Sequence, residues 1–342
     1  MTKKASVLVS VVIANKNGEK FLERCLVSVL VEKGNFEVIV VDDGSDLAVS
    51  LGGVVTLGKV KVIRLDKSVG AAEARNVGVK NSTGKYVLFL DVDTKIHLGW
   101  YKEILSFFKR NKKTGAAQVK LLTMGTKKFD SAGEHTGQFG FLVERARGAK
   151  DVGQFDKEVE IFSGKSAGMI IRREVFKKLE GFDIDYQIFL EDTDLFWRVW
   201  LLGWEVRFCP RVVVEHAYLT KEKSFDHYVQ NRVFYRGARN TVMNLVKNLG
   251  WKRALWVVPV NVFCWLLLGV VFFLKGEFKR GWAMFAGVGW NVLNFYKVLG
   301  KRSLVQSGRK ISDEDLFLRV GIKRGLGYYL GKALTYLTGK TF

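Results

Sequence analysis

The sequence predicts an α/β protein, in which a Rossmann-like, mixed but mostly parallel sheet is covered by helices and is followed by membrane-associated helices. Short runs rich in Val and Ile alternate with segments of helical periodicity, which is typical of a parallel sheet. Several of these runs end in acidic turns. A stretch without any charged side chain, residues 254–274, follows later in the chain.

The first part of the chain alternates between strands and helices. Strands are predicted at residues 7–13, 36–41, 60–65, 86–90 and 116–122. Helices are predicted at residues 19–31, 71–80 and 100–110. The carboxyl ends of parallel strands meet at one edge of a sheet, so the acidic residues that follow these strands should converge there. These residues are Asp42, Asp43, Asp91 and Asp93.

The middle of the chain is less regular. The Gly-rich stretch 125–153 has little periodicity and is predicted to contain loops that shape a substrate site. Residues 163–183 then predict a strand and a helix, and residues 189–203 predict a helix closed by Gly203. Two further strands are predicted within residues 205–216. We therefore expect one catalytic domain over residues 1–245.

The C-terminal part predicts a membrane hairpin. Residues 254–274 are long enough to cross about 30 Å of hydrocarbon as a helix, so we predict a transmembrane or deeply membrane-seated helix there. Residues 281–299 carry Asn and Lys side chains and can either span or lie in the interface. A pair of buried core helices is the alternative. The hairpin should cover residues 246–302, and residues 303–342 should form a basic, amphipathic tail.

The charge balance narrows the class of partner. A net charge of +21 suits nucleic acid or an anionic membrane surface. Basic residues bracket the apolar segments, which favours membrane lipids over nucleic acid, and we predict no nucleic-acid partner. The three cysteines are widely spaced, so neither a zinc site nor a disulfide framework is expected. A reducing cytosol is the predicted environment of the catalytic part.

Asp91 and Asp93 end an apolar strand, and this position sets them apart from an ordinary acidic turn. Two carboxylates so close together raise each other's pKa unless a cation lies between them. Oxygen ligands of this kind suit Mg²⁺ or Mn²⁺. An isolated Asp-x-Asp is weak evidence, but Asp42 and Asp43 follow a neighbouring strand and increase its weight.

The chain resembles a known family. Its motifs "VSVVIANKNG", "VIVVDDGSD", "GAAEARNVGVKNSTGKYVLFLDVDT", "SAGMIIRREVFKKLEGFD" and "EDTDLFWRVWLLGWEVRFCP" resemble, in order and spacing, the inverting family 2 glycosyltransferases of GT-A (nucleotide-diphospho-sugar transferase) fold. The resemblance covers residues 6–244. The motifs "SAGEHTG", "GFDIDYQIFLEDTDLFWR" and "VVVEH" look most similar to the rhamnosyltransferase-like branch.

The resemblance implies a donor site. Asp42 would read the nucleotide base, and the turn that contains Asn15 and Asn17 would lie against the nucleoside. Arg75, with Asn76 beside it, would approach the ribose and diphosphate. An Asx turn at Asp42 and a surface charge at Arg75 are the alternatives. The family's usual aromatic residue after the first strand is Lys16 here, so stacking on the nucleoside is not expected from that position.

The resemblance also implies a reaction centre. Asp93 would bind the metal, with Asp91 contacting the ribose or the metal through water, and His216 would be a third ligand. Asp192 would be the general base, Glu191 would place the acceptor, and Asp194 would be a substitute base. A structural histidine and an acidic first turn that complements the helix dipole are the alternatives.

We therefore predict a membrane-associated, Mn²⁺- or Mg²⁺-dependent glycosyltransferase. It would move a sugar from a nucleotide-diphosphate sugar to a lipid-linked or cell-surface glycan, with its catalytic domain on the cytoplasmic side of the cell membrane. A polyprenyl-phosphate glycosyl synthase is the alternative within this class. A catalytically silent, nucleotide-sugar-binding membrane scaffold is the alternative from another class.

Overall fold

The structure is a computed structural model that describes residues 7–49, 58–217 and 227–338. The chain divides into two compact units. The first comprises residues up to 133, 144–199 and 204–219, and the second comprises residues 134–143, 200–203 and everything from residue 220 onward. The structure divides into two units, whereas the sequence predicts three parts, residues 1–245, 246–302 and 303–342. The three-part division stays a prediction.

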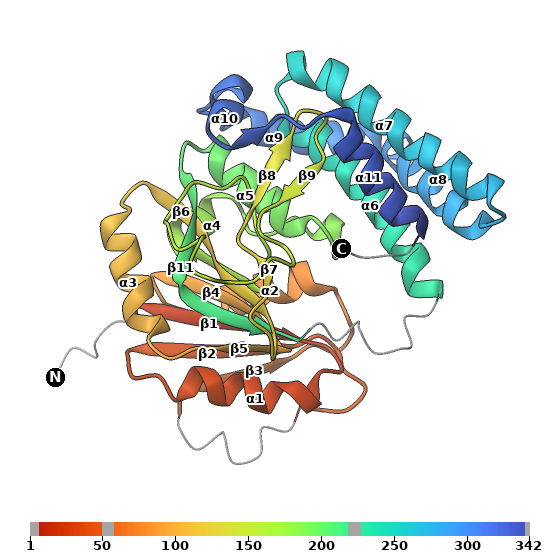
Figure 1. The fold of residues 1–342 in the computed structure, drawn as a ribbon. Helices are drawn as coiled ribbons and strands as arrows, with labels where there is room; N and C mark the ends of the chain where they lie inside the picture. The colour runs from red at the N-terminus through yellow and green to blue at the C-terminus, as the bar shows by residue number, and fades with distance from the viewer. Residues whose placement is uncertain (1–6, 50–57, 218–226, 339–342) are drawn as a thin grey trace. The chain divides into compact units, whose positions relative to one another are not determined.

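The first unit is built on one mixed sheet (Figure 1). Its strand order is β3-β2-β1-β4-β10-β6-β11-β5, and β7 pairs with β6 outside this path. The strands are β1 Val9–Asn15, β2 Phe36–Asp42, β3 Val60–Arg64, β4 Tyr86–Asp91, β5 Thr94–Ile96, β6 Thr114–Thr123, β7 Phe129–Ser131, β10 Gly168–Arg172 and β11 Glu205–His216. Strands β3, β2, β1 and β4 are parallel, whereas β10 is antiparallel to both of its neighbours. The predicted mostly parallel sheet is confirmed.

Helices cover both faces of this sheet. They are α1 Glu19–Leu30, α2 Ala71–Lys80, α3 Trp100–Arg110, α4 Arg173–Lys178 and α5 Glu191–Leu201. Alternate residues of β2 show the two faces, because Val38 and Val40 pack into the main core whereas Ile39 and Val41 pack with Ala74 of α2. Helix α2 approaches the sheet closely at Gly78, where any side-chain carbon would clash with Val12.

The strand registers bring several polar residues to one edge of the sheet. Asn15, at the end of β1, pairs with Asp42 of β2, and Ala14 pairs with Asp91 of β4. At the other side of the sheet, β11 pairs with β5 so that His216 lies opposite Thr94. The turn after Asp91 and the end of β11 therefore meet at the carboxyl edge.

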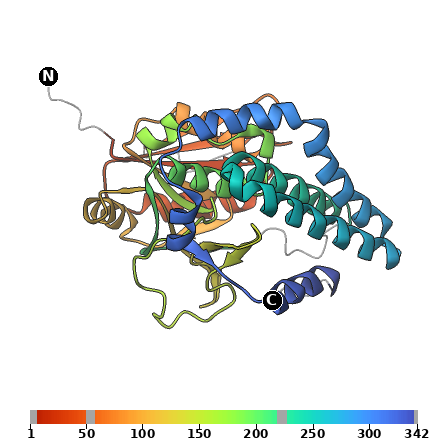
Figure 2. The same cartoon turned by 90° about the horizontal axis from the view of Figure 1, so that it is seen from above.

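The second unit is mainly helical. Its helices are α6 His227–Asn248, α7 Trp251–Leu274, α8 Phe278–Leu293, α9 Phe295–Ser307, α10 Asp313–Val320 and α11 Leu326–Thr338, and Figure 2 shows α7 and α8 side by side. A small sheet joins β8 Glu134–Gly137 to β9 Leu142–Glu144 and β12 Gly321–Ile322. Helices α7 and α8 pack together and approach closely at Gly269 and Gly281, and the placement of this pair in a membrane stays a prediction. Among the described residues, α7 alone is long and apolar enough to cross a membrane.

One predicted segment was wrong in detail, and two others contain more regular structure than the sequence indicated. The second apolar helix does not continue over residues 281–299, because the chain breaks at Asn294 between α8 and α9. The stretch 125–153 contains β7, β8 and β9 in addition to loops. The described part of the tail forms α10, β12 and α11.

Candidate active site

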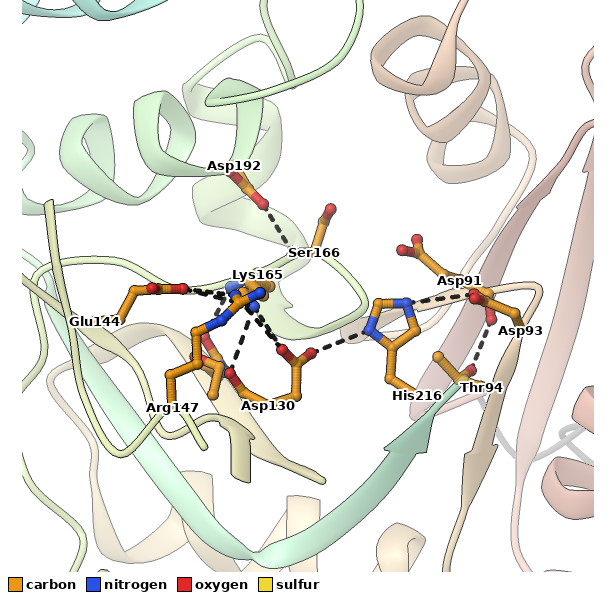
Figure 3. Close-up of polar contacts among 12 residues, drawn as sticks. Asp91, Asp93, Thr94, Asp130, Glu144, Arg147, Lys165, Ser166, Asp192 and His216 are labelled. Atoms are coloured by element: carbon orange, nitrogen blue, oxygen red, sulfur yellow. Dashed lines mark hydrogen bonds and ion pairs between the residues drawn. The ribbon is translucent and has the colours of Figure 1, made fainter. Parts of the chain in front are cut away.

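Asp91, Asp93 and His216 form a cluster that can hold a metal ion (Figure 3). One ligand atom from each residue lies within 4.8 Å of the others. The hydroxyl of Thr94 donates a hydrogen bond of 2.7 Å to the carbonyl of Asp91, which holds the turn between β4 and β5. Two carboxylates and an imidazole are a suitable donor set for a divalent cation. The structure thus brings the three predicted metal ligands together.

A third aspartate orients the histidine. Nε2 of His216 lies 3.4 Å from Oδ1 of Asp93, and Nδ1 lies 3.1 Å from Oδ2 of Asp130. Asp130 belongs to β7 and is almost fully buried. A carboxylate on one ring nitrogen fixes the tautomer and directs the other nitrogen toward a metal, and many metal sites use this arrangement.

The charges around His216 are closely balanced. Burial alone would lower the pKa of His216, but its hydrogen bonds to Asp130 and Asp93 and the nearby Asp91 outweigh burial and raise that pKa to about 10. Burial would raise the pKa of Asp130, but His216 and Lys165 hold it well below its usual range. The imidazolium thus neutralises the carboxylates, and a divalent cation would take the place of its proton.

Sequence reasoning missed Asp130 and the basic residues around it. Nζ of Lys165 lies 2.6 Å from Oδ1 of Asp130, and Arg147 forms an ion pair of 2.7 Å with Glu144 (Figure 3). Asp130 stands directly before the quoted motif "SAGEHTG", and Lys165 lies within residues 163–183. That position is the only signal in the sequence, because Asp130 reaches His216 through the pairing of β7 with β6.

Replacing Asp130 by Asn should weaken Mn²⁺ binding by about 10- to 100-fold, because the amide orients His216 less firmly than the carboxylate does. Titration calorimetry of the full chain measures this affinity. Asp156→Asn is the matched control, since Asp156 is also ion-paired, to Lys120, and has no contact with His216. An equal loss in both variants would contradict an orienting role for Asp130.

Arg75 links the metal-binding cluster to the start of α5. From α2, its Nη2 donates to Asp91 and its Nη1 donates to Glu191, each at 2.9 Å. The side chains of Arg75 and Glu191 are 6% and 5% exposed, so this is a buried ion pair. The alternative of a surface charge at Arg75 is therefore excluded. Asn76, by contrast, bonds the backbone of Phe182 through both its amide nitrogen and its oxygen.

Asp192 lies at the start of α5 and is only partly buried. Its carboxylate accepts hydrogen bonds from the amides of Ser166 (3.1 Å) and Thr193 (2.8 Å) (Figure 3). Burial raises the pKa of Asp192, although these two amides oppose the shift. Burial and the charge of Asp192 also raise the pKa of Glu191. A carboxylate whose pKa is raised accepts a proton more readily, as a general base must.

The backbone before α5 is strained. Gln187, Phe189 and Leu190 have φ values of 59°, 71° and 65°, which side chains other than Gly rarely adopt. Such strain is common at functional sites because it fixes the direction of the next element. Asp194, predicted as a substitute base, is fully buried and forms an ion pair of 2.8 Å with Arg198. The same carboxylate accepts a hydrogen bond of 3.3 Å from the hydroxyl of Tyr186, which holds the helix to the preceding segment.

Replacing Arg75 by Met should lower the free energy of unfolding by about 3–5 kcal/mol, because the Glu191 carboxylate would stay buried without its cation. Urea denaturation followed by circular dichroism measures the change. Arg110→Met is the matched control and should cost about 0–1 kcal/mol, since that arginine is 38% exposed. The double variant Arg75→Met, Glu191→Met should recover much of the loss; no recovery would contradict the proposed cause.

The residues predicted to contact the nucleoside lie together at the same edge. The side chain of Asn15 accepts from the amide of Gly18 and donates to Ser45, and Asn17 exchanges hydrogen bonds with Asp46. Asp42 is fully buried, and its two oxygens accept from Ser45 and Arg64. The Asx-type turn predicted as the alternative is thus present at Asp42, and its role in reading a base stays a prediction.

The sheet order, the antiparallel β10 between β4 and β6, and the acidic cluster at the carboxyl edge define the GT-A fold of glycosyltransferases. A family model for glycosyl transferase family 2 matches residues 10–180, which is half of the chain. The chain belongs to glycosyltransferase family 2. The rhamnosyltransferase-like branch stays a prediction.

Two curated relatives match part of the chain. The pre-mycofactocin glycosyltransferase of Mycobacterium tuberculosis is 28% identical over 236 residues, which cover 67% of this chain and 46% of that protein. Probable N-acetylgalactosaminyltransferase 7 of Caenorhabditis elegans is 31% identical over 206 residues, which cover 53% of this chain and 33% of that protein. The match thus spans less than half the length of either relative.

Two solved structures share the fold. Residues 1–349 of S. aureus TarS in complex with UDP-GlcNAc give a TM-score of 0.57 at 18% identity, over 98% of this chain and 93% of that one. GalNAc-T7 with UDP, GalNAc and Mn²⁺ gives a TM-score of 0.56 at 20% identity, over 71% of this chain and 48% of that one. At this level of identity, the likeness concerns the fold.

Proposed function

We propose that this protein is an inverting, metal-dependent glycosyltransferase that moves a sugar from a nucleotide-diphosphate sugar to a hydroxyl of a lipid-linked or cell-surface glycan. The observation that carries the proposal is the arrangement of the site. A metal-binding cluster at the sheet edge is tied through Arg75 to a helix that begins with Glu191 and Asp192. A catalytically silent scaffold would have no need of this assembly.

Asp91, Asp93 and His216 would hold the metal ion. A set that combines carboxylates with an imidazole favours Mn²⁺ over Mg²⁺, which prefers oxygen ligands and keeps several waters. Bound there, the cation would neutralise the negative charge that develops on the departing nucleotide diphosphate. Asp130 would keep His216 in place, and Thr94 would keep the turn at Asp91 in shape.

Asp192 would be the general base. Its carboxylate is held by two amides and would take the proton of the acceptor hydroxyl as that oxygen attacks the anomeric carbon. The new C–O bond forms on the face opposite the leaving group, and the bond from the anomeric carbon to the phosphate oxygen breaks. The nucleotide diphosphate leaves with the electron pair. Glu191, held by Arg75, would place the acceptor.

Asn15, Asn17 and Asp42 would line the nucleoside side of the donor site, and Arg75 would lie toward the diphosphate. The nucleotide is proposed to be UDP, because TarS and GalNAc-T7 were both solved with UDP or a UDP-sugar. Two amides hold the proposed base Asp192 in place. A base is needed for a hydroxyl acceptor and not for the bare phosphate of a polyprenyl-phosphate glycosyl synthase, so this arrangement favours a hydroxyl acceptor. We place the enzyme at the cytoplasmic face of the cell membrane.

The test is nucleotide release by the purified, detergent-held full chain from a panel of UDP-, GDP- and dTDP-sugars, with Mn²⁺ or with EDTA. We expect release from UDP-sugars that requires the metal. Binding of every donor is followed separately by calorimetry. Metal-independent release would contradict the metal assignment, and the absence of both release and binding across the panel would overturn the donor site.

A further inference from the structure

Helix α7 presents an apolar face that none of the described residues of the second unit covers. From Phe263 onward its exposed large apolar residues recur every three or four positions, and Trp256 lies two turns before Phe263, so they share one face of the helix. They are Leu255, Trp256, Phe263, Leu267, Val270 and Leu274. At a rise of about 1.5 Å per residue, this face is about 30 Å long. The opposite face packs inside the unit through Val257, Trp265 and Phe272.

Helix α6 accompanies the packed face of α7 over most of its length. The rings of Phe234 and Phe272 lie 5.3 Å apart, so an early turn of α6 meets the last turns of α7. Further along α6, Gly237 lies beside Trp265, which precedes Phe272 in α7 by about two turns. The two helices are joined by a short connection after Asn248. The two helices therefore run antiparallel. If α7 crossed a bilayer, α6 would have to cross it as well.

Helix α6 is poorly suited to cross hydrocarbon. Along the length that it shares with α7 it carries Arg232, Arg236 and Arg239, followed by Asn240, Asn244 and Lys247. Arg232 is exposed and Arg236 is half-buried, whereas Arg239 and Lys247 are buried inside the unit, where Arg239 lies 3.8 Å from the ring centre of Trp290 of α8. Charged side chains at the centre of a bilayer are costly and rare. The charge on α6 thus argues against a spanning α7.

We propose that α7 lies in the plane of a membrane, with its exposed apolar face in one leaflet and both of its ends on the same side. An amphipathic assembly that presents one apolar face is the usual form of such monotopic attachment. The helix predicted at residues 254–274 to be transmembrane or deeply membrane-seated is thus assigned as a surface anchor. This inference concerns where the chain sits and does not depend on the reaction proposed above.

The chemistry of the face selects lipid as its occupant. The six large apolar residues bring no hydrogen-bonding group except the indole of Trp256. Exposed Trp251 and Trp282 lie near its two ends, and Trp is enriched at the level of lipid headgroups. Lys252, Lys275 and Lys279 are exposed at the same ends. Cations at that depth favour anionic lipids.

Cysteine labelling tests the orientation of the full chain. In a Cys264→Ser background, Lys252→Cys and Lys275→Cys each place a thiol at one exposed end of α7, while Cys25 and Cys209 stay buried in both variants. Sealed vesicles from the producing cells, right-side-out and inverted, are treated with a membrane-impermeant maleimide. We expect both variants to react from the same side. Labelling from opposite sides would show a spanning helix and overturn the proposal.

Vesicle binding tests the face itself. The variant Phe263→Asp, Leu267→Asp should bind vesicles of phosphatidylcholine with about 30% phosphatidylglycerol at least about tenfold more weakly, because two large apolar side chains no longer enter the leaflet. The matched control is Leu47→Asp, Leu98→Asp, which changes two similarly exposed leucines of the first unit. Equal losses would overturn the proposal, as would unchanged binding accompanied by conversion of a dimer to a monomer.

Discussion

Replacing Asp192 by Asn should lower transfer to a hydroxyl acceptor by about 10²- to 10⁴-fold, the usual contribution of a general base. The amide keeps the size of the side chain but cannot accept the hydroxyl proton. Donor binding and Mn²⁺ affinity should be unchanged, since neither Asp91 nor Asp93 is altered. The measurement is the initial rate of transfer at saturating donor. A normal rate in the variant would contradict the assignment of the base.

The pH dependence gives an independent check on Asp192. The base must be ionised, so the rate falls as the pH drops through its pKa. Because burial raises that pKa, the acid limb of kcat/KM should lie above the usual range for an aspartate. An amide at this position cannot titrate, so the variant Asp192→Asn should lose this limb.

A phosphate acceptor also separates the two proposed reactions, because it has no proton to lose and should react almost normally with the same variant.

Replacing Asp93 by Asn should lower transfer by about 10³-fold or more, since a bound metal contributes several kcal/mol to the stabilisation of developing charge. The residual rate should no longer respond to Mn²⁺ or EDTA. Asp93 is 5% exposed and lies 3.4 Å from His216, so its loss leaves the cluster one ligand short. Transfer rates at increasing Mn²⁺ measure the effect.

Asp66→Asn is the matched control for Asp93→Asn, because Asp66 is an exposed aspartate of the same unit and lies outside the metal-binding cluster. It should retain a normal rate and a normal Mn²⁺ response. A variant Asp93→Asn that kept full metal dependence would place the metal elsewhere. An equal fall in both variants would point to charge on the unit as a whole, and not to ligation.

The regular elements could be predicted because their signals are local. The bounds predicted for α2 and α3 are confirmed to the residue, since both helices have apolar residues at helical spacing and end near polar residues. Strands β7 to β9 have three or four residues each, too few for alternation to show. The break at Asn294 was missed because hydropathy averages over such a position.

The candidate site followed the same division. Asp91, Asp93, Glu191 and Asp192 stand in motifs, and the structure brings them near one another through β4, α2 and α5. Asp130 could not be predicted, because its partner His216 is 86 residues away in sequence. The ion pair of Asp42 could not be predicted either, because its partner Arg64 lies on the neighbouring strand. Both contacts depend on residues that are distant in the sequence.

The shared guanidinium of Arg75 has a consequence for the kinetics of such an enzyme. A cation bound at Asp91 would share that carboxylate with Arg75, whose other nitrogen is paired with Glu191. Occupancy on one side of the site thus changes the charge felt on the other. By linkage, the coupling acts equally in both directions. Donor and acceptor would then each change the affinity of the other through one buried side chain.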